Sequence, residues 1–184
     1  MADDRRRIAP LIVLAVAAVV AGLFVILAGS DTTRSEQINS FLIDRPAPRA
    51  LGTTLDDRPF DLSRRKGSWV VLNFFDPSCV PCVQEHPELV VFAAEQATIA
   101  DGAELYTIIN AGSDDDVREF FEREGGGWPV VRDPSGAISV AFGVSQVPET
   151  WVIDPEGIVR VRYAGQITAS AVAVKLQQLR EQRI

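Results

Sequence analysis

The amino-acid sequence predicts an α/β fold, a central mixed sheet flanked by helices, with one N-terminal transmembrane helix. After about residue 51, short β-branched and aromatic runs alternate with helical segments, and an antiparallel hairpin and a helix close the chain. This order of elements is typical of an α/β layered domain. Upstream, residues 8–29 contain no charged residue, and about twenty apolar residues are enough to span a bilayer.

The N-terminal apolar run carries an orientation signal. Arg5, Arg6 and Arg7 directly precede it, and positive residues stay on the cytoplasmic side of a membrane. We therefore expect a cytoplasmic N-terminus over residues 1–7, a retained single-pass anchor in the cell membrane over 8–29, and the rest of the chain outside, on the periplasmic side. A cleavable signal has a shorter apolar region of roughly 7–15 residues, although small residues at the end of this run leave cleavage open.

Residues 30–50 are polar and end in Pro46-Ala47-Pro48, which predicts an extended linker before a domain that spans residues 51–184. The first elements expected in this domain are a short edge strand over 58–62 and a buried strand over 69–75. The second strand is expected because its residues are apolar, β-branched or aromatic almost throughout.

The middle of the domain predicts two helices and one strand. A helix over residues 83–100 and a buried strand over 104–110 follow the first buried strand. The next helix covers residues 117–124, because the short polar and acidic residues 113–116 favour a helix N-terminus and three glycines end the segment.

The C-terminal part predicts a hairpin and a closing helix. Residues 128–131 form a short extended piece and residues 136–142 a helical turn. Residues 150–163 predict the hairpin, since the turn residues Pro155-Glu156-Gly157 interrupt two β-rich runs. An amphipathic helix over 168–183 completes the domain.

The charge of the chain excludes one class of partner. The sequence has 25 acidic and 18 basic side chains, for a net charge of −7. A nucleic-acid-binding protein would show a basic patch or stripe instead. We expect no nucleic-acid partner.

Cys79 and Cys82 are the only cysteines, and two residues separate them. A disulfide across so short a loop constrains little of the unfolded chain, so the spacing favours a redox pair over a structural crosslink. The same spacing at the start of a helix lets one thiol ionise easily while its neighbour waits to displace it. A strand, a short loop and a CxxC that opens a helix form the thioredoxin-like arrangement.

Two other interpretations of the cysteine pair are possible. A zinc site needs four protein ligands when it is structural and three when it is catalytic. Beyond the two cysteines the chain has one histidine, His86, so zinc would require carboxylates or a second chain. The other alternative is an inert thiol pair. We expect a redox-active dithiol with no metal and no cofactor other than the Cys79–Cys82 disulfide.

Four segments, one of which contains the CxxC, carry a wider sequence pattern. They are Pro46-Ala47-Pro48 with Phe60-Asp61-Leu62-Ser63, the stretch from Val70 to Pro87, Gly143-Val144-Ser145-Gln146-Val147-Pro148-Glu149-Thr150, and Gly157-Ile158-Val159-Arg160 with Tyr163-Ala164-Gly165. On these segments the chain resembles membrane-anchored, thioredoxin-like thiol–disulfide oxidoreductases of the TlpA/ResA class, and within it the CcmG/DsbE branch of cytochrome c maturation. The resemblance covers about residues 46–178. One departure is Ser78, because the family usually has tryptophan just before the first cysteine.

The position of the two thiols predicts their roles. Cys79 should stand at the helix N-terminus, where free N–H groups and the helix dipole stabilise a thiolate, so it is the expected nucleophile. Cys82, one turn further in, should then attack the mixed disulfide and release the reduced partner.

The resemblance also implies supporting residues. It places a cis-proline at Pro148 beside the sulfurs, with Val147 offering its backbone to an extended substrate strand. Glu149, next to the proline, is a further candidate. The resemblance places a glutamate at Glu85, where it could tune the thiols or accept a proton. The spacing puts Glu85 on the same helix face as Cys82.

Four positions have a functional and a structural interpretation. Asn73 falls where thioredoxin has a buried acid, but a hydrogen-bonded strand residue is an equally good account. We expect His86 to lie at the surface or in packing, and Trp128 and Trp151 to belong to the core.

The resemblance implies a reductant that acts on protein disulfides. Its expected partners are apocytochrome c, whose haem-attachment cysteines it would keep reduced, and a membrane thiol carrier that supplies electrons. The alternative is an oxidase that forms disulfides in secreted proteins, because sequence does not determine the direction of electron flow. A thioredoxin-like peroxidase is a weaker alternative, since Asp76 stands where such an enzyme has a hydroxyl residue. A metallochaperone is the remaining class.

Overall fold

The computed structural model describes residues 14, 16–23 and 36–182. The chain divides into two units between residues 33 and 34. In the first unit the described residues are helical. No helix within the described residues is long and apolar enough to cross a membrane, and most of the expected anchor over 8–29 lies outside them.

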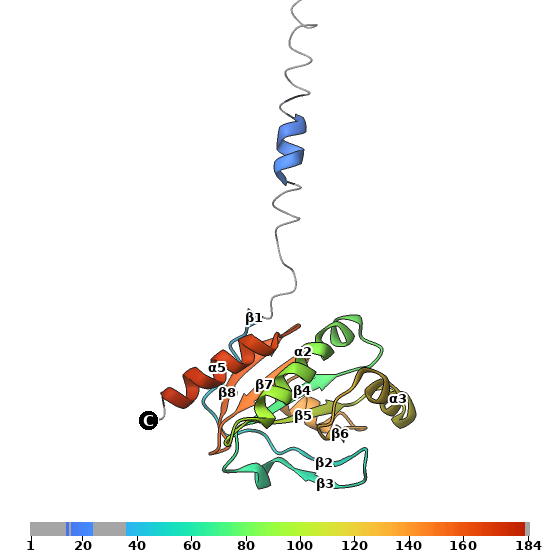
Figure 1. Ribbon diagram of the computed structural model, residues 1–184, viewed down its shortest axis with the longest axis vertical. Helices are drawn as coiled ribbons and strands as arrows, with labels where there is room; N and C mark the ends of the chain where they lie inside the picture. The colour runs from blue at the N-terminus through green and yellow to red at the C-terminus, as the bar shows by residue number, and fades with distance from the viewer. Residues whose placement is uncertain (1–13, 15, 24–35, 183–184) are drawn as a thin grey trace, which may run out of the picture. The chain divides into compact units, whose positions relative to one another are not determined.

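Eight strands of the described chain form one mixed sheet in the order β1-β8-β7-β4-β5-β6-β2-β3 (Figure 1). The β4–β5 and β5–β6 pairs are parallel and the other pairs are antiparallel. The strands are β1 (Glu36–Gln37), β2 (Leu51–Thr54), β3 (Pro59–Asp61), β4 (Val70–Phe75), β5 (Glu104–Ile109), β6 (Val130–Arg132), β7 (Glu149–Ile153) and β8 (Val159–Ala164). The expectation of an α/β fold with a central mixed sheet is confirmed.

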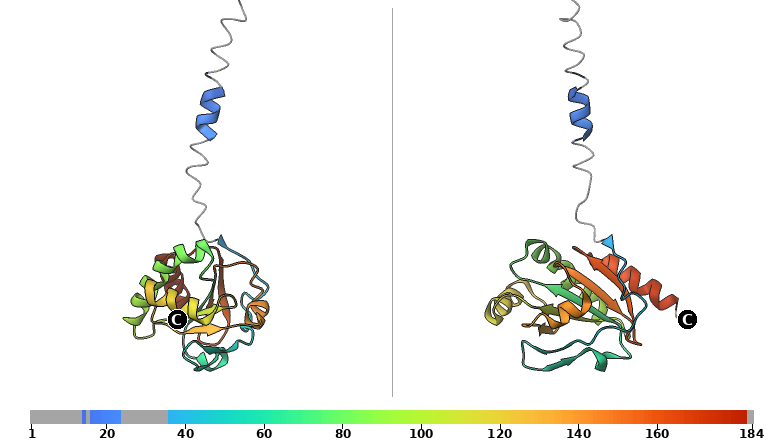
Figure 2. Two further views of the ribbon diagram at one scale, coloured as in Figure 1. Left: turned by 90° about the vertical axis from the view of Figure 1, so that its right-hand side faces the viewer. Right: turned by 180° about the vertical axis from the view of Figure 1, so that it is seen from behind.

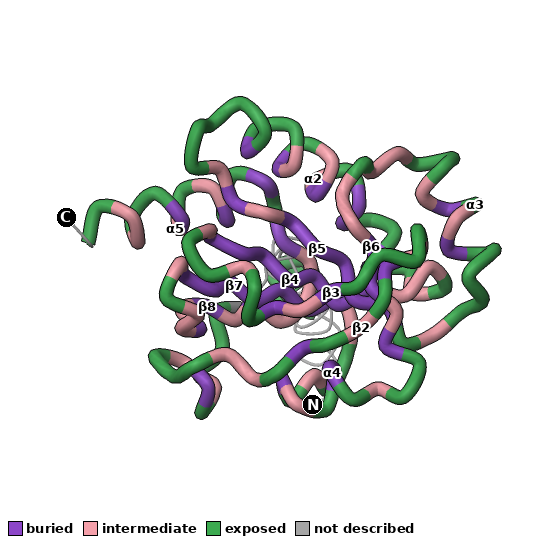
Figure 3. Tube along the Cα trace, turned by 90° about the horizontal axis from the view of Figure 1, so that it is seen from below, coloured by how far each residue is buried: buried purple, intermediate pink, exposed green. Residues whose placement is uncertain are grey.

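Helices lie on both faces of the sheet. They are the 3₁₀ helix η1 (Leu62–Arg65) and the α-helices α2 (Val80–Ala97), α3 (Asp114–Glu124), α4 (Ala137–Phe142) and α5 (Ala169–Glu181). Helices α2 and α5 cover one face, and α4 covers the other (Figures 2 and 3). Helix α3 packs on the α2 side, because its Phe120 shares a buried cluster with Phe75 and Cys82.

A hydrophobic core lies on each face of the sheet, and the central strands contribute residues to both. All six residues of β4 and all five of β7 are buried, as expected for strands with helices on both sides (Figure 3). Side chains alternate along a strand, so Leu72 packs with Trp151 and α4 on one face while Val71 packs with α2 and α5 on the other. The outer strand β8 alternates buried and half-buried residues.

Two helices start earlier than the sequence predicts. Helix α2 starts at Val80 and not at residue 83, with Cys79 as its N-cap residue, so the CxxC occupies the first turn. Pro81 fits there because the first N–H groups of a helix have no intrahelical partner. Helix α3 also starts early, because the Ser113 hydroxyl accepts a 3.1 Å hydrogen bond from the amide of Asp116.

The segment 36–50 belongs to the folded domain, whereas the sequence suggested a linker over 30–50. Strand β1 pairs with β8, with Gln37 opposite Tyr163. The Asp44 amide then donates to the Val159 carbonyl at 2.8 Å, and Leu42 is buried in the core. These contacts join residues more than a hundred positions apart, so local polarity gives no sign of them.

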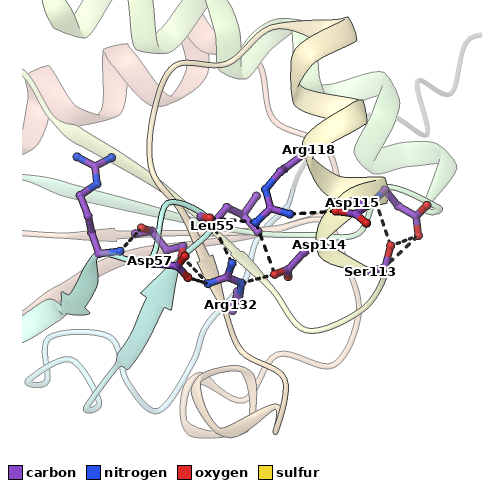
Figure 4. A network of polar contacts seen from close by, with 10 residues as sticks. Leu55, Asp57, Ser113, Asp114, Asp115, Arg118 and Arg132 are labelled. Atoms are coloured by element: carbon purple, nitrogen blue, oxygen red, sulfur yellow. Dashed lines mark hydrogen bonds and ion pairs between the residues drawn. The ribbon is translucent and has the colours of Figure 1, made fainter.

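An arginine network joins the turn after β2 to the start of α3 (Figure 4). Arg132 donates to the Thr54 carbonyl at 2.6 Å and pairs with Asp57 at 3.0 Å and Asp114 at 2.8 Å. Arg118 adds a 3.2 Å hydrogen bond to the Leu55 carbonyl. The network ties the β2–β3 turn to β6 and to the start of α3.

Candidate active site

Cys79 lies in a short loop that connects the end of β4 to α2. The Asp76 carboxylate accepts hydrogen bonds of 2.8 Å from both the amide and the hydroxyl of Ser78, and the Cys79 amide donates to the Asp76 carbonyl at 3.1 Å. These contacts fix the turn that presents Cys79 at the helix N-terminus. The polar Ser78 therefore has a local role in the turn, together with Asp76.

The two thiols differ sharply in exposure. Both are free, Cys79 is half-buried, and Cys82 is completely buried. Burial raises the pKa of the Cys82 thiol far above its usual range, and the adjoining Cys79 thiol and the Glu85 carboxyl add to the rise. Cys82 is therefore protonated at neutral pH, and it needs a base before it can attack.

The loop before β7 faces the thiols. The Val147–Pro148 peptide bond is cis, which confirms the isomer expected for this proline. The Cys79 thiol donates a 3.5 Å hydrogen bond to the Val147 carbonyl. Cys79, Cys82 and Val147 also pack in one apolar cluster. The structure thus brings the cysteine pair and the proline loop together.

Glu85 is a fully buried carboxyl in α2, one turn after Cys82. The Asn73 side-chain amide donates to Glu85 Oε1 at 2.7 Å and to the Thr150 hydroxyl at 3.0 Å. Burial raises the pKa of Glu85 to about 8, and hydrogen bonds such as that from Asn73 limit the rise. Among the residues that the structure describes, none is within hydrogen-bond geometry of Glu85 Oε2 or Asn73 Oδ1. The carboxyl can therefore hold or release a proton near neutral pH.

Glu149 lies on the other face of the sheet, where it has no contact with the thiols. Its carboxylate accepts two 2.9 Å hydrogen bonds from Arg162 and one of 2.9 Å from the Trp151 indole. Alternation along β7 explains this position, because Thr150 faces Asn73 and its neighbours Glu149 and Trp151 face the opposite way.

His86 belongs to a buried aromatic cluster on the α2 side, as expected for a packing role. Its ring lies 4.8 Å from the Phe120 ring and 5.5 Å from the Trp128 ring, centroid to centroid. Burial lowers the pKa of His86, and Nε2 lies 2.8 Å from the Gly125 carbonyl, so the neutral ring carries its proton on Nε2. Trp151 is completely buried, so the expectation that it is a core residue is confirmed.

One contact of the site had no signal in the sequence. The Gln166 side-chain amide, from the loop between β8 and α5, donates to the Pro81 carbonyl between the two cysteines at 2.9 Å. Eighty-five positions separate these residues.

In the described part of the chain, no group of three or more His, Cys, Asp or Glu side chains could hold a metal ion.

A free CxxC at the start of a helix, faced by a cis-proline loop on a mixed sheet, defines a thioredoxin-like thiol–disulfide oxidoreductase. The AhpC/TSA family model matches residues 43–162, and the chain belongs to this family. It is 31% identical to the thiol:disulfide interchange protein HelX of Rhodobacter capsulatus over 67% of its length and 68% of the relative's.

Two further similarities agree with this assignment. The chain is 31% identical to the thiol-disulfide oxidoreductase ResA of Bacillus subtilis, over 68% of this chain and 69% of ResA. The crystal structure of a DsbF homologue from Corynebacterium diphtheriae superposes with a TM-score of 0.67 at 21% identity, over 82% of this chain and 95% of that one. This last similarity concerns the fold alone.

Proposed function

We propose that this enzyme reduces protein disulfides outside the cytoplasm through Cys79 and Cys82. The asymmetry of the two thiols supports the chemistry in this proposal, which is an attack by Cys79 on a partner disulfide. Cys79 is half-exposed at the N-terminus of α2, whereas Cys82 is completely buried and protonated. A partner disulfide can reach only the first of these, because attack requires access and a thiolate.

The exchange proceeds in two steps. The Cys79 thiolate attacks one sulfur of the partner disulfide, which forms a mixed disulfide and releases the other partner sulfur as a thiolate that takes up a proton. Glu85, in its ionised form, accepts the proton of Cys82. The Cys82 thiolate then attacks the Cys79 sulfur, so the second partner sulfur leaves reduced and the enzyme retains the Cys79–Cys82 disulfide.

Val147 and Pro148 provide the backbone that binds the substrate beside Cys79. Pro148 has no N–H, and the Val147 carbonyl already faces the Cys79 sulfur. An extended partner segment can add its backbone to Val147 and bring its disulfide to Cys79. Glu149 takes no part in this contact because Arg162 binds it on the opposite face.

The cellular role we propose is cytochrome c maturation. The anchor over residues 8–29 would hold the domain at the outer face of the cell membrane, next to a thiol carrier that supplies two electrons. Apocytochrome c would be the partner whose cysteines are reduced. The resemblance to the CcmG/DsbE branch, the charge-free run 8–29 and the three arginines before it support this role.

The decisive experiment is the steady-state redox state of the pair in intact cells, measured by acid quenching and thiol alkylation. A mostly reduced pair supports the reductant, since electrons must then reach the domain across the membrane. A mostly oxidised pair overturns it in favour of the disulfide-forming oxidase. The Cys79→Ser variant is the control, because it cannot form the disulfide in either case.

A further inference from the structure

Gly165 and Gln166 connect the cis-proline loop with the CxxC turn. They lie in the loop between β8 and α5. The Gly165 amide donates to the Pro148 carbonyl at 2.9 Å, and the Gln166 side chain donates to the Pro81 carbonyl at 2.9 Å. Gly165 has φ +87°, a conformation that glycine adopts readily and other residues rarely do. This dipeptide therefore holds the cis-proline loop and the CxxC turn in one geometry.

Both amide hydrogens of Gln166 are used. A carbonyl oxygen can only accept, so the atom of Gln166 that faces Pro81 is its nitrogen. The same nitrogen lies 3.1 Å from Gln84 Oε1, which accepts the second hydrogen. Gln84 thus orients the amide of Gln166, and the donor is aimed at one peptide group.

That peptide group lies in the first turn of α2, and Cys79 is the N-cap residue of this helix. The Pro81 carbonyl and the Cys82 N–H belong to the same planar unit. An N-cap side chain accepts from the N–H of the second or third helical residue. Here the second is Pro81, which has no N–H, so the Cys82 amide is the donor available to a Cys79 thiolate. In the reduced protein the Cys79 thiol instead donates to Val147.

We propose that Gln166 is a positioning residue that stabilises the Cys79 thiolate through the Pro81–Cys82 peptide. A donor on the carbonyl of a peptide polarises it and strengthens the bond that its N–H gives, as in other hydrogen-bond chains. The inference rests on the proposed attack by Cys79. It makes Gln166 a residue that sets the reactivity of the enzyme without touching the partner.

The test compares Gln166→Met with wild-type protein. Methionine keeps the length of the side chain and loses the donor. The rate of iodoacetamide modification of Cys79 is measured against pH on the reduced protein, with the modified cysteine identified by peptide mass. We expect Cys79 of the variant to react about threefold more slowly at low pH. At high pH, where Cys79 is ionised in both proteins, the variant should reach the wild-type rate. The matched control is Gln177→Met, at an exposed glutamine of α5 whose side chain donates to Glu181 at 2.9 Å.

Gln166→Glu independently tests the direction in which the pH profile of Cys79 modification shifts. Its carboxylate cannot donate to Pro81 and adds negative charge beside the helix N-terminus, so the shift of the profile should exceed that of Gln166→Met. Equal profiles for wild type and both variants would overturn the inference, as would a uniform loss of rate at every pH. If instead Cys82 is the cysteine modified first in wild-type protein, the proposed function itself is wrong.

Discussion

Asn73 in β4 donates a 2.7 Å hydrogen bond to the Glu85 carboxyl in α2. The contact ties the central strand to the redox helix directly below the CxxC turn. Glu85 lies one turn after Cys82, so an ionised carboxylate and a buried thiol share one side of the helix. The charge of Glu85 raises the pKa of Cys82, and burial raises that of Glu85, so the two groups cannot both be charged without a large cost.

Replacing Glu85 by glutamine should slow the second step of the exchange. Without a proton acceptor, Cys82 attacks the mixed disulfide slowly, and we expect release of the reduced partner to fall by about a hundredfold. Formation of the mixed disulfide should change little, because Cys79 does not depend on this carboxyl. Rapid-quench kinetics with a model disulfide separate the two steps.

The pH profile provides the control for that variant. In wild-type protein the second step should accelerate as pH rises through about 8, where Glu85 ionises. In Glu85→Gln this inflection should vanish. An unchanged inflection would mean that another group accepts the proton.

The same substitution should change the pH dependence of stability. The folded-state pKa of about 8 lies above the ordinary value of 4.5, so the folded protein binds more protons than the unfolded chain between these values. Stability due to this group is full below about pH 4.5 and falls as pH rises through 8. Relative to wild type, Glu85→Gln should gain about 2–4 kcal/mol between pH 5 and pH 9. Urea unfolding at the two pH values measures the change.

Replacing Cys82 by serine should trap partners. The half-exposed Cys79 still attacks a disulfide, but no thiol remains to release the product, so mixed disulfides accumulate. Cys79→Ser should trap none, because Cys82 is completely buried. Non-reducing gels of extracts from cells that carry each variant give the comparison. Equal trapping by both variants would contradict the assigned roles.

Local sequence predicted the parts of this site that depend on local spacing. The strand before the cysteines, the helix after them and the shared face of Cys82 and Glu85 all follow from residues close together in the chain. Asn73, in contrast, reaches Thr150 through the register of β4 with β7, and it reaches Glu85 through the packing of α2 on β4. Gln166 reaches Pro81 only because the loop before α5 ends beside α2. Such contacts depend on packing between distant segments, which no local pattern encodes.

For Glu149, closeness in the sequence does not give closeness to the thiols in the structure. Its place beside Pro148 in the sequence suggested a role at the thiols, yet one step along a strand turns a side chain to the other face. The extended appearance of 36–50 was misleading in a similar way, because its few apolar residues, such as Leu42, find partners only in the finished sheet.

The Glu149–Arg162 pair predicts a stability effect that leaves thiol chemistry intact. Glu149 is completely buried, Arg162 is largely buried, and the guanidinium also lies 5.2 Å from the centroid of the Trp151 ring. Arg162→Leu leaves the carboxylate buried without its cation, so we expect a loss of about 3 kcal/mol in urea unfolding. The double variant Arg162→Leu/Glu149→Gln should recover most of this loss, because the charge that needed a partner is gone. Arg123→Leu, which breaks exposed ion pairs with Glu119 and Glu124 and a cation–π contact over Phe120, should cost about 1 kcal/mol. A double variant no more stable than Arg162→Leu alone would show that the loss comes from packing of the arginine and not from the unpaired charge.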